Sequence, residues 1–244
     1  MTRSNHIFGQ IICAKYSLLG LILMLLLSMV FTSVIAAELA GHVTELEGKA
    51  YAKPPEGAIR KLEANDKVYA EERIITSRKS SLEFTFTDDT KISLGASTIV
   101  NLDSYNYKKN NIDDEKTGST TSILQGVVRA FTGLIAKRKP ARVRFKTSVA
   151  TIGIRGTHFV AEVDGDSATI ILLAQQDTNA SNAIEVSNSF GKVEIDKAGY
   201  GTSVPDAQSP PSPPRRMQTP NTMTRVLRSI QTNQRVRIPR SPIR

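Results

Sequence analysis

Short stretches in which hydrophobic and polar side chains alternate run through most of the chain after residue 42. The clearest lie at residues 82–86 and 143–145, where Leu, Phe and Val alternate with Glu, Thr and Arg. A period of two predicts strands that bury one face and leave the other in water. Turn-forming residues separate such stretches at 88–89, 164–166 and 189–191. We therefore expect an all-β fold of short, mostly antiparallel strands, of the β-sandwich or β-roll type.

One longer stretch, residues 118–131, fits two structures. Ile123, Val127 and Ala130 have helical spacing, whereas two adjacent valines favour a strand. Because a glycine directly precedes the valine pair, we interpret the stretch as a strand. Residues 106–121 are polar and rich in Asn, and we expect them to form an exposed loop.

The N-terminal segment has the order of an export signal. Residues 18–37 form an apolar run without a charge, and the preceding residues carry only Arg3 and Lys15 as charged side chains. Small residues at the end of the run fit cleavage by signal peptidase. The run is also long enough to remain as an uncleaved membrane anchor. In both cases we expect the rest of the chain outside the cytoplasm, in the periplasm or the extracellular space, and without a disulfide, since the single cysteine is Cys13.

The composition changes again at Pro205, where a Pro-rich stretch leads into an Arg-rich end. Proline at this density favours an extended linker. We therefore expect a signal segment at 1–37, one β domain at 38–204 and a disordered tail at 205–244.

The net charge of +9 comes from the two ends, because residues 38–204 carry 22 basic and 22 acidic side chains. A neutral body gives no indication of nucleic-acid binding. The candidates for contact with an anionic surface are in the tail: Arg215, Arg216, Arg225, Arg228, Arg235 and Arg237. Within the tail, Met223, Val226, Leu227 and Ile230 would form one apolar face of a helix, which suggests docking on a partner or on a membrane interface.

The most informative segment is KTSVATIGIRGTHFV, residues 146–160, called the hallmark segment below. It is a predicted strand interrupted at Gly153 and Gly156, which indicates a bulge or a close backbone approach. An arginine at Arg155 needs acceptors or an exposed position. We favour a structural ion pair or bonds to backbone carbonyls over a carboxylate or phosphate of a partner.

This segment resembles the hallmark of the FecR domain family, a run of the form T-x-x-A-x-x-x-(I/V)-R-G-T-x-F-x-V. The matching residues are Thr147, Ala150, Ile154, Arg155, Gly156, Thr157, Phe159 and Val160. Flanking segments agree in order, so that the resemblance covers roughly residues 40–204. The chain departs from the family in its turns, and an insertion stands at LLAQQDTNASNAIEV. These departures affect loop geometry more than the fold.

The resemblance implies an envelope protein that binds or senses. Iron-citrate regulators of the family join a cytoplasmic sigma-factor-binding region, a membrane helix and a periplasmic FecR domain. Too few residues precede the apolar run here to fold as a sigma-binding region. We therefore expect a stand-alone exported FecR domain that binds an envelope protein or a surface polymer, with strand addition at a sheet edge as one route. The alternative is a periplasmic component of a sigma-regulator-like system that acts through a separate membrane partner.

Residues for catalysis are hard to find in this sequence. We expect His158 to be a plain surface or edge histidine, and Asp88 with Asp89, like Asp164 with Asp166, to serve turns instead of a carboxylate pair or a calcium site. We therefore expect no enzymatic activity, cofactor or bound metal.

Overall fold

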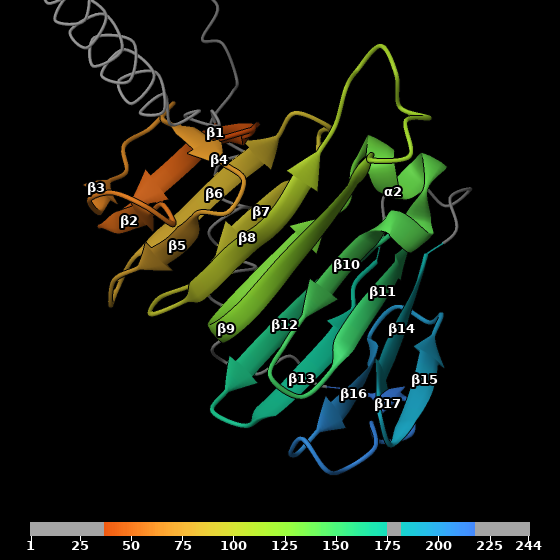
Figure 1. Ribbon diagram of the computed structural model, residues 1–244. Helices are drawn as coiled ribbons and strands as arrows, with labels where there is room; N and C mark the ends of the chain where they lie inside the picture. Colours follow the sequence, from red (N-terminus) through yellow and green to blue (C-terminus); the bar gives the residue numbers. More distant parts are fainter. Residues whose placement is uncertain (1–36, 175–181, 218–244) are drawn as a thin grey trace, which may run out of the picture. The chain divides into compact units, whose positions relative to one another are not determined.

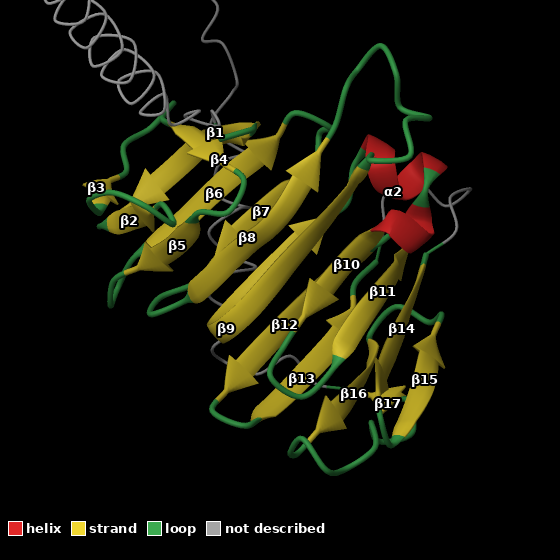
Figure 2. Cartoon of the chain, in the orientation of Figure 1, coloured by secondary structure: helices red, strands yellow, loops and turns green. Residues whose placement is uncertain are grey.

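The computed structural model describes residues 37–174 and 182–217. The apolar run at 18–37 lies almost wholly outside these residues, as do Cys13, Arg225, Arg228, Arg235 and Arg237. The described chain is built from strands, and helical residues are confined to α2 (Leu134–Arg138) and a 3-10 turn at Pro140–Arg142 (Figures 1 and 2). The prediction of an all-β fold is confirmed.

The strands form two sheets, here called A and B. Sheet A runs in the order β4 (Lys67–Tyr69), β1 (Leu39–Glu47), β6 (Ser81–Phe86), β7 (Lys91–Leu94), β9 (Gly118–Phe131), β12 (His158–Asp164), β13 (Ser167–Leu172), β16 (Tyr200–Val204) and β17 (Arg215–Arg216). Sheet B runs in the order β3 (Arg60–Lys61), β2 (Ala50–Lys53), β5 (Arg73–Thr76), β8 (Ile99–Asn106), β9, β10 (Val143–Lys146), β11 (Thr151–Arg155), β14 (Ala183–Asn188) and β15 (Gly191–Ile195). Neighbouring strands are antiparallel, except that β10 runs parallel to β9.

Strand β9 belongs to both sheets. Its first half pairs with β8 and β10, and its second half pairs with β7 and β12. The chain bends between the halves at Gly126, where φ is +89° and a Cβ would lie 2.7 Å from the Cα of Thr98. Only glycine fits such a bend. The strand predicted for residues 118–131 is therefore confirmed, and the loop predicted for 106–121 is shorter, since β8 ends at Asn106 and β9 begins at Gly118.

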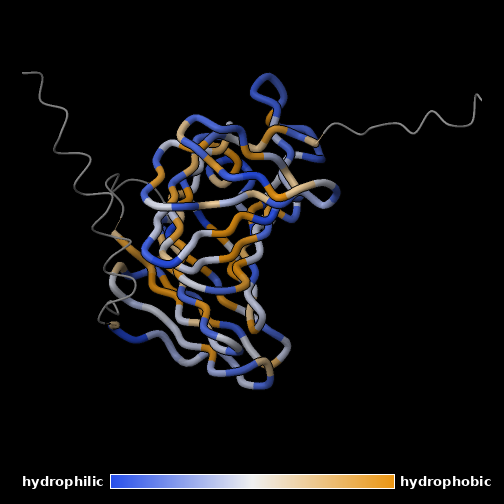
Figure 3. Tube along the Cα trace, turned by 90° about the vertical axis from the view of Figure 1, so that its left-hand side faces the viewer, coloured by the Kyte–Doolittle hydropathy of each residue, from blue (hydrophilic) through white to orange (hydrophobic). Residues whose placement is uncertain are grey.

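The inner faces of the sheets enclose one hydrophobic core. Phe145 from sheet B and Phe159 from sheet A meet edge to face, with ring centroids 5.0 Å apart. Figure 3 shows hydrophobic and hydrophilic residues alternating along the strands. This alternation is what the period of two in the sequence requires of a two-layer sandwich.

The fold extends beyond Val204, where the sequence suggested that the domain ends. Asn188 Nδ2 donates to the Ser209 carbonyl oxygen at 2.8 Å, and Thr202 Oγ1 donates to that of Ser212 at 2.7 Å. Strand β17 then pairs with β16. Residues 205–217 thus differ from the predicted disordered tail, because an extended Pro-rich segment can lie along a sheet through its carbonyl groups.

Candidate functional site

The hallmark segment carries the chain from one sheet to the other. Strand β11 lies in sheet B and β12 in sheet A, and the turn between them contains Gly156 with φ of +56°. The apolar residues of the segment are buried: Ala150, Ile154, Phe159 and Val160 are at most 6% exposed, the first three in the main core and Val160 on the opposite side of sheet A. The family signature is thus a structural element of this sandwich.

The two hallmark threonines are also engaged inside the fold. The Thr157 backbone N–H donates to Thr132 Oγ1 at 2.9 Å, and this hydroxyl donates to the Thr157 carbonyl oxygen at 3.1 Å. Thr147 Oγ1 accepts the backbone N–H groups of Val149 and Ala150. The Thr157 hydroxyl itself is buried without a hydrogen-bond partner among the described residues. Its backbone, and not its hydroxyl, ties β12 to the end of β9.

Arg155 is exposed and forms an ion pair with Glu194 of β15, with Nη1 and Oε1 3.2 Å apart. More than half of each side chain remains in solvent. An exposed pair of this kind contributes little stability, about 0–1 kcal/mol. The pair matches the structural ion pair favoured from the sequence, but it is a weak one.

His158 lies half-buried on the outer face of sheet A. Arg129 Nε donates to His158 Nε2 at 2.7 Å, and His158 Nδ1 lies 2.8 Å from the Ala174 carbonyl oxygen. Nδ1 therefore carries the proton of a neutral ring. Burial, and secondarily the Arg129 charge, lower the pKa of His158 to about 4. The ring is more enclosed than the predicted edge histidine.

Asp88 occupies a turn as predicted, but this turn is buried. Its carboxylate accepts Thr90 N–H and Thr90 Oγ1–H, as well as the N–H of Ile135 at the start of α2. Burial raises the pKa of Asp88 in spite of these bonds. The Tyr105 hydroxyl accepts the Asp88 N–H at 3.0 Å. Asp88 thereby joins the β6–β7 turn to β8 and α2.

Neither Asp164 nor Asp166 takes part in a metal-like cluster: Asp164 ends β12, and Asp166 lies in the two-residue turn between β12 and β13. Across residues 37–174 and 182–217, no group of three His, Cys, Asp or Glu side chains is gathered as metal ligands would be. In the same residues no helix has the length and apolarity needed to cross a bilayer.

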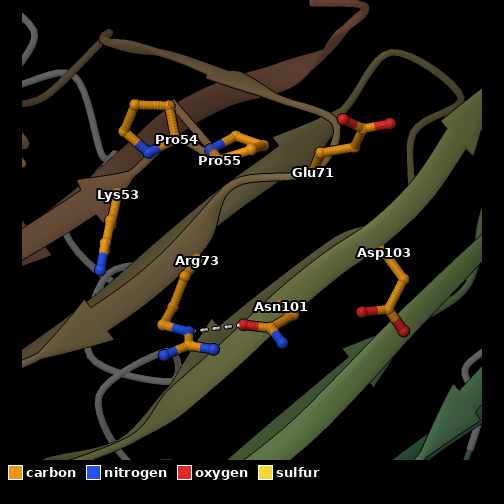
Figure 4. Close-up of a pocket in the computed structure, with 7 residues that line it drawn as sticks. All are labelled: Lys53, Pro54, Pro55, Glu71, Arg73, Asn101 and Asp103. Atoms are coloured by element: carbon orange, nitrogen blue, oxygen red, sulfur yellow. Dashed lines mark hydrogen bonds between the residues drawn. The ribbon is translucent and has the colours of Figure 1, made fainter. Parts of the chain in front are cut away.

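A polar cleft of about 400 Å³ lies on the outer face of sheet B (Figure 4). Its lining residues are Lys53, Pro54, Pro55, Glu71, Arg73, Asn101 and Asp103. They come from the end of β2, the β4–β5 turn, β5 and β8. We call this the sheet B cleft.

Strand register assembles the cleft. Lys53 of β2 is paired with Arg73 of β5, and Arg73 is paired with Asn101 of β8. The three side chains therefore form one cross-strand row, and Asp103 follows two residues further along the same face. The Glu71 N–H donates to the Leu102 carbonyl oxygen at 2.6 Å, which fixes the β4–β5 turn beside the row.

The cleft separates its charges. Figure 4 shows the Lys53 and Arg73 cationic groups on one side and the Glu71 and Asp103 carboxylates on the other. Arg73 Nε donates to Asn101 Oδ1 at 2.8 Å. Within the described residues, the Lys53 ammonium and the Glu71 carboxylate have no hydrogen-bonded or ionic partner. This arrangement can accept an anionic group at one side and a donor group at the other.

Sequence reasoning did not find this site. Its residues are scattered over β2, β5 and β8 without a motif, and only the strand pairing brings them together. The one available signal was that Lys53, Arg73 and Asn101 occupy outward positions of alternating stretches, which is common to any exposed sheet face.

The sheet edges are less suited to strand addition by a partner than the sequence suggested. Among the described residues the edge strands β3, β4 and β17 have two or three residues each. The remaining edge, β15, carries Lys192 and Glu194, which form ion pairs with Glu185 of β14 and Arg155 of β11. Short and charged edges disfavour pairing with another chain.

Arg215 and Arg216, the described members of the predicted basic surface, form β17 and are exposed. Arg216 pairs in register with Tyr200 and Arg215 with Gly201. These two residues thus lie in a strand, whereas the sequence predicted that they belong to a disordered tail.

Comparison with known proteins matches the chain to one family model and to solved structures. The family model described as FecR protein matches residues 72–176, which span β5 to β13. A search of curated proteins gave no match. Two crystal structures of a protein assigned as an anti-sigma factor from Parabacteroides distasonis are similar, with TM-scores of 0.46 and 0.44 and 11% identity, and in each case the similarity covers 60% of this chain and 60% of the other chain.

FecR domains are typically associated with the cell envelope and with signalling, and the family is generally non-enzymatic. The residues matched by the family model include the whole hallmark segment and most strands of both sheets. Residues 72–176 are therefore identified as a FecR domain.

Proposed function

We propose that this chain is an exported, non-enzymatic binding module of the cell envelope, which recognises a partner protein through the sheet B cleft. The proposal includes the export signal at 1–37 and a signalling or scaffolding role for the complex. A periplasmic component of a sigma-regulator-like system would use the same cleft towards its membrane partner.

The observation that carries the proposal is the direct pairing of Lys53 with Arg73. Like charges opposite each other on neighbouring strands destabilise a sheet by about 0.2–1 kcal/mol. The described fold offers no compensating carboxylate to Lys53. A side chain that lowers the stability of the fold, without a compensating contact inside the protein, is typical of a binding site.

The charges of the cleft favour a protein over a purely anionic polymer as the partner. Glu71 and Asp103 would repel a polymer that carries one negative charge per repeat. A polypeptide segment can place an Asp or Glu side chain between Lys53 and Arg73 and its own N–H or cationic groups against the two carboxylates. A surface polymer remains a second partner class to test.

The experiment is affinity capture from envelope extract with the mature chain and its Lys53→Glu variant. The variant places a carboxylate opposite Arg73, so that binding should be lost while the melting temperature stays equal or rises slightly. This combination separates loss of binding from loss of folding.

Lys91→Glu is the matched control, because Lys91 is an exposed strand lysine on sheet A opposite Thr85 and Phe131. It should retain the captured partner. Equal capture by all three proteins, or equal loss in both variants, would remove the cleft from the proposal.

A further inference from the structure

A second, smaller apolar cluster lies on the outer face of sheet A. Val127, Val160 and Ile171 form it, with Leu173 and Met217 packed against them. Their neighbours along the strands, such as Val128, Phe159 and Ile170, point into the main core. Since side chains alternate between faces, the cluster lies on the opposite side of the sheet. We call these five residues the outer patch.

The outer patch is built by strand register. Val160 is paired with Ile171, and Ile171 is paired with Gly201. Because Gly201 has no side chain, Met217 can lie over it: a Cβ on Gly201 would be 2.9 Å from Met217 Sδ. The Met217 N–H donates to the Gly199 carbonyl oxygen at 3.0 Å, which fixes this position.

Val160 and Ile171 are almost fully buried, at 0% and 1% exposure, although they face away from the core. A cover over this face is therefore part of the folded protein. The described residues that pack there, Leu173 and Met217, are themselves only partly buried.

The chain that follows Met217 has the composition of such a cover. Met223, Val226, Leu227 and Ile230 fall within an arc of about 100° on a helical wheel. Arg225 and Arg228 fall on the opposite side. Asn221 and Thr222 stand before this segment and are residue types that begin helices.

The distances permit docking within one chain. From β16, beside β17, the patch reaches across β13 and β12 to Val127 on β9, three strand spacings or about 15 Å. An eight-residue helix is about 12 Å long. The five residues 218–222 can span up to about 17 Å. The linker can therefore place residues 223–230 over the patch without moving β17.

We propose that residues 223–230 dock as an amphipathic helix on the outer patch of sheet A of their own chain. Met217 is the first residue of this contact, and Leu227 and Val226 continue it over Val160 and Val127. In this position Arg225 and Arg228 point to solvent. The tail is then an integral cover of sheet A, with a basic outer surface.

Cysteine cross-linking of the full chain tests this arrangement. In a Cys13→Ser background, Glu162→Cys on the outer face of β12 is combined with Leu227→Cys, and mild oxidation is followed by non-reducing electrophoresis. Glu162 is paired with Val127, so that its position adjoins the patch. Because the two thiols are tethered at an effective concentration on the order of millimolar, we expect a monomeric cross-link that is independent of protein concentration.

The control replaces Glu162→Cys by Lys146→Cys on the exposed face of sheet B, which should give no cross-link with Leu227→Cys. A second measurement needs no cysteine: Leu227→Asp should lower the melting temperature by roughly 5 °C, and Arg228→Asp should leave it unchanged.

Three results would overturn the proposal. A cross-link between two chains would assign the patch to a second copy. The absence of a cross-link with unchanged melting in Leu227→Asp would leave the segment off the patch. Binding of the full chain to phosphatidylglycerol vesicles that is lost in Leu227→Asp, without a cross-link, would assign the apolar face to lipid.

Discussion

The hallmark segment and the sheet B cleft use polar residues in opposite ways. In the hallmark segment the Thr147 hydroxyl and the Thr157 backbone are bonded inside the protein, and Ala150, Ile154 and Phe159 pack in the core. In the cleft, Lys53 and Glu71 face solvent without partners in the described structure. The residues that identify the family thus build the sandwich, whereas the candidate contact surface consists of residues that no motif reveals.

The largest effect is expected when an aromatic ring is removed from the hallmark segment. Phe159 is fully buried against Phe145, so Phe159→Ala should lower the free energy of unfolding by about 3–5 kcal/mol. Urea unfolding measures the change. Phe190→Ala is the control, because Phe190 is 56% exposed and should change stability by less than about 0.5 kcal/mol. A small effect at Phe159 would contradict a structural hallmark.

The next largest effect is expected at Thr132, whose hydroxyl is bonded to the Thr157 backbone. Thr132→Val removes both bonds between its hydroxyl and the Thr157 backbone and should cost about 1–3 kcal/mol. Thr157→Val removes a buried hydroxyl without a partner and should be neutral or slightly stabilising. Thermal unfolding of the two variants checks the order. The reverse order would show that the hallmark hydroxyl has a role that the contacts do not reveal.

Asp88 gives a pH-dependent test of the buried turn. Burial raises its pKa above the ordinary value of 3.8, so the folded state holds this proton to higher pH than the unfolded state does. The free energy of unfolding due to Asp88 therefore falls as pH rises from 3.8 through the raised pKa. Urea unfolding of wild type and Asp88→Asn from pH 3 to 8 should show the wild type losing stability relative to the variant. A constant difference would contradict the raised pKa.

The smallest effect is expected at Arg155. Its exposed pair with Glu194 should be replaceable, so Arg155→Lys should change the free energy of unfolding by at most about 0.5 kcal/mol. Differential scanning calorimetry, with Glu194→Gln as the comparison, measures this. A loss of several kcal/mol would place Arg155 with the buried part of the hallmark segment.

Local signals in the sequence predicted much of the fold. The alternation at residues 82–86 became β6, and the turns at 88–89, 164–166 and 189–191 all join neighbouring antiparallel strands. The valine pair after Gly126 correctly indicated a strand, because β-branched side chains pack well on a pleated sheet.

Features that depend on distant contacts were not predictable in this way. Asp88 has the sequence of a surface turn, and its burial depends on α2, which begins 46 residues later. Composition alone marked residues 205–217 as a tail, although Asn188 and Thr202 hold this segment on the sheets. The cleft required the register of three strands, which a single sequence does not reveal.

The most direct test of the cleft as the contact surface is lysine footprinting. The chain without residues 1–37 is acetylated with and without envelope extract, and modification of each lysine is measured by mass spectrometry. We expect strong protection of Lys53, with unchanged modification of Lys91 on sheet A and of Lys146 at the start of the hallmark segment. Protection of Lys146 with none at Lys53 would contradict the account, because it would make the hallmark segment the contact surface.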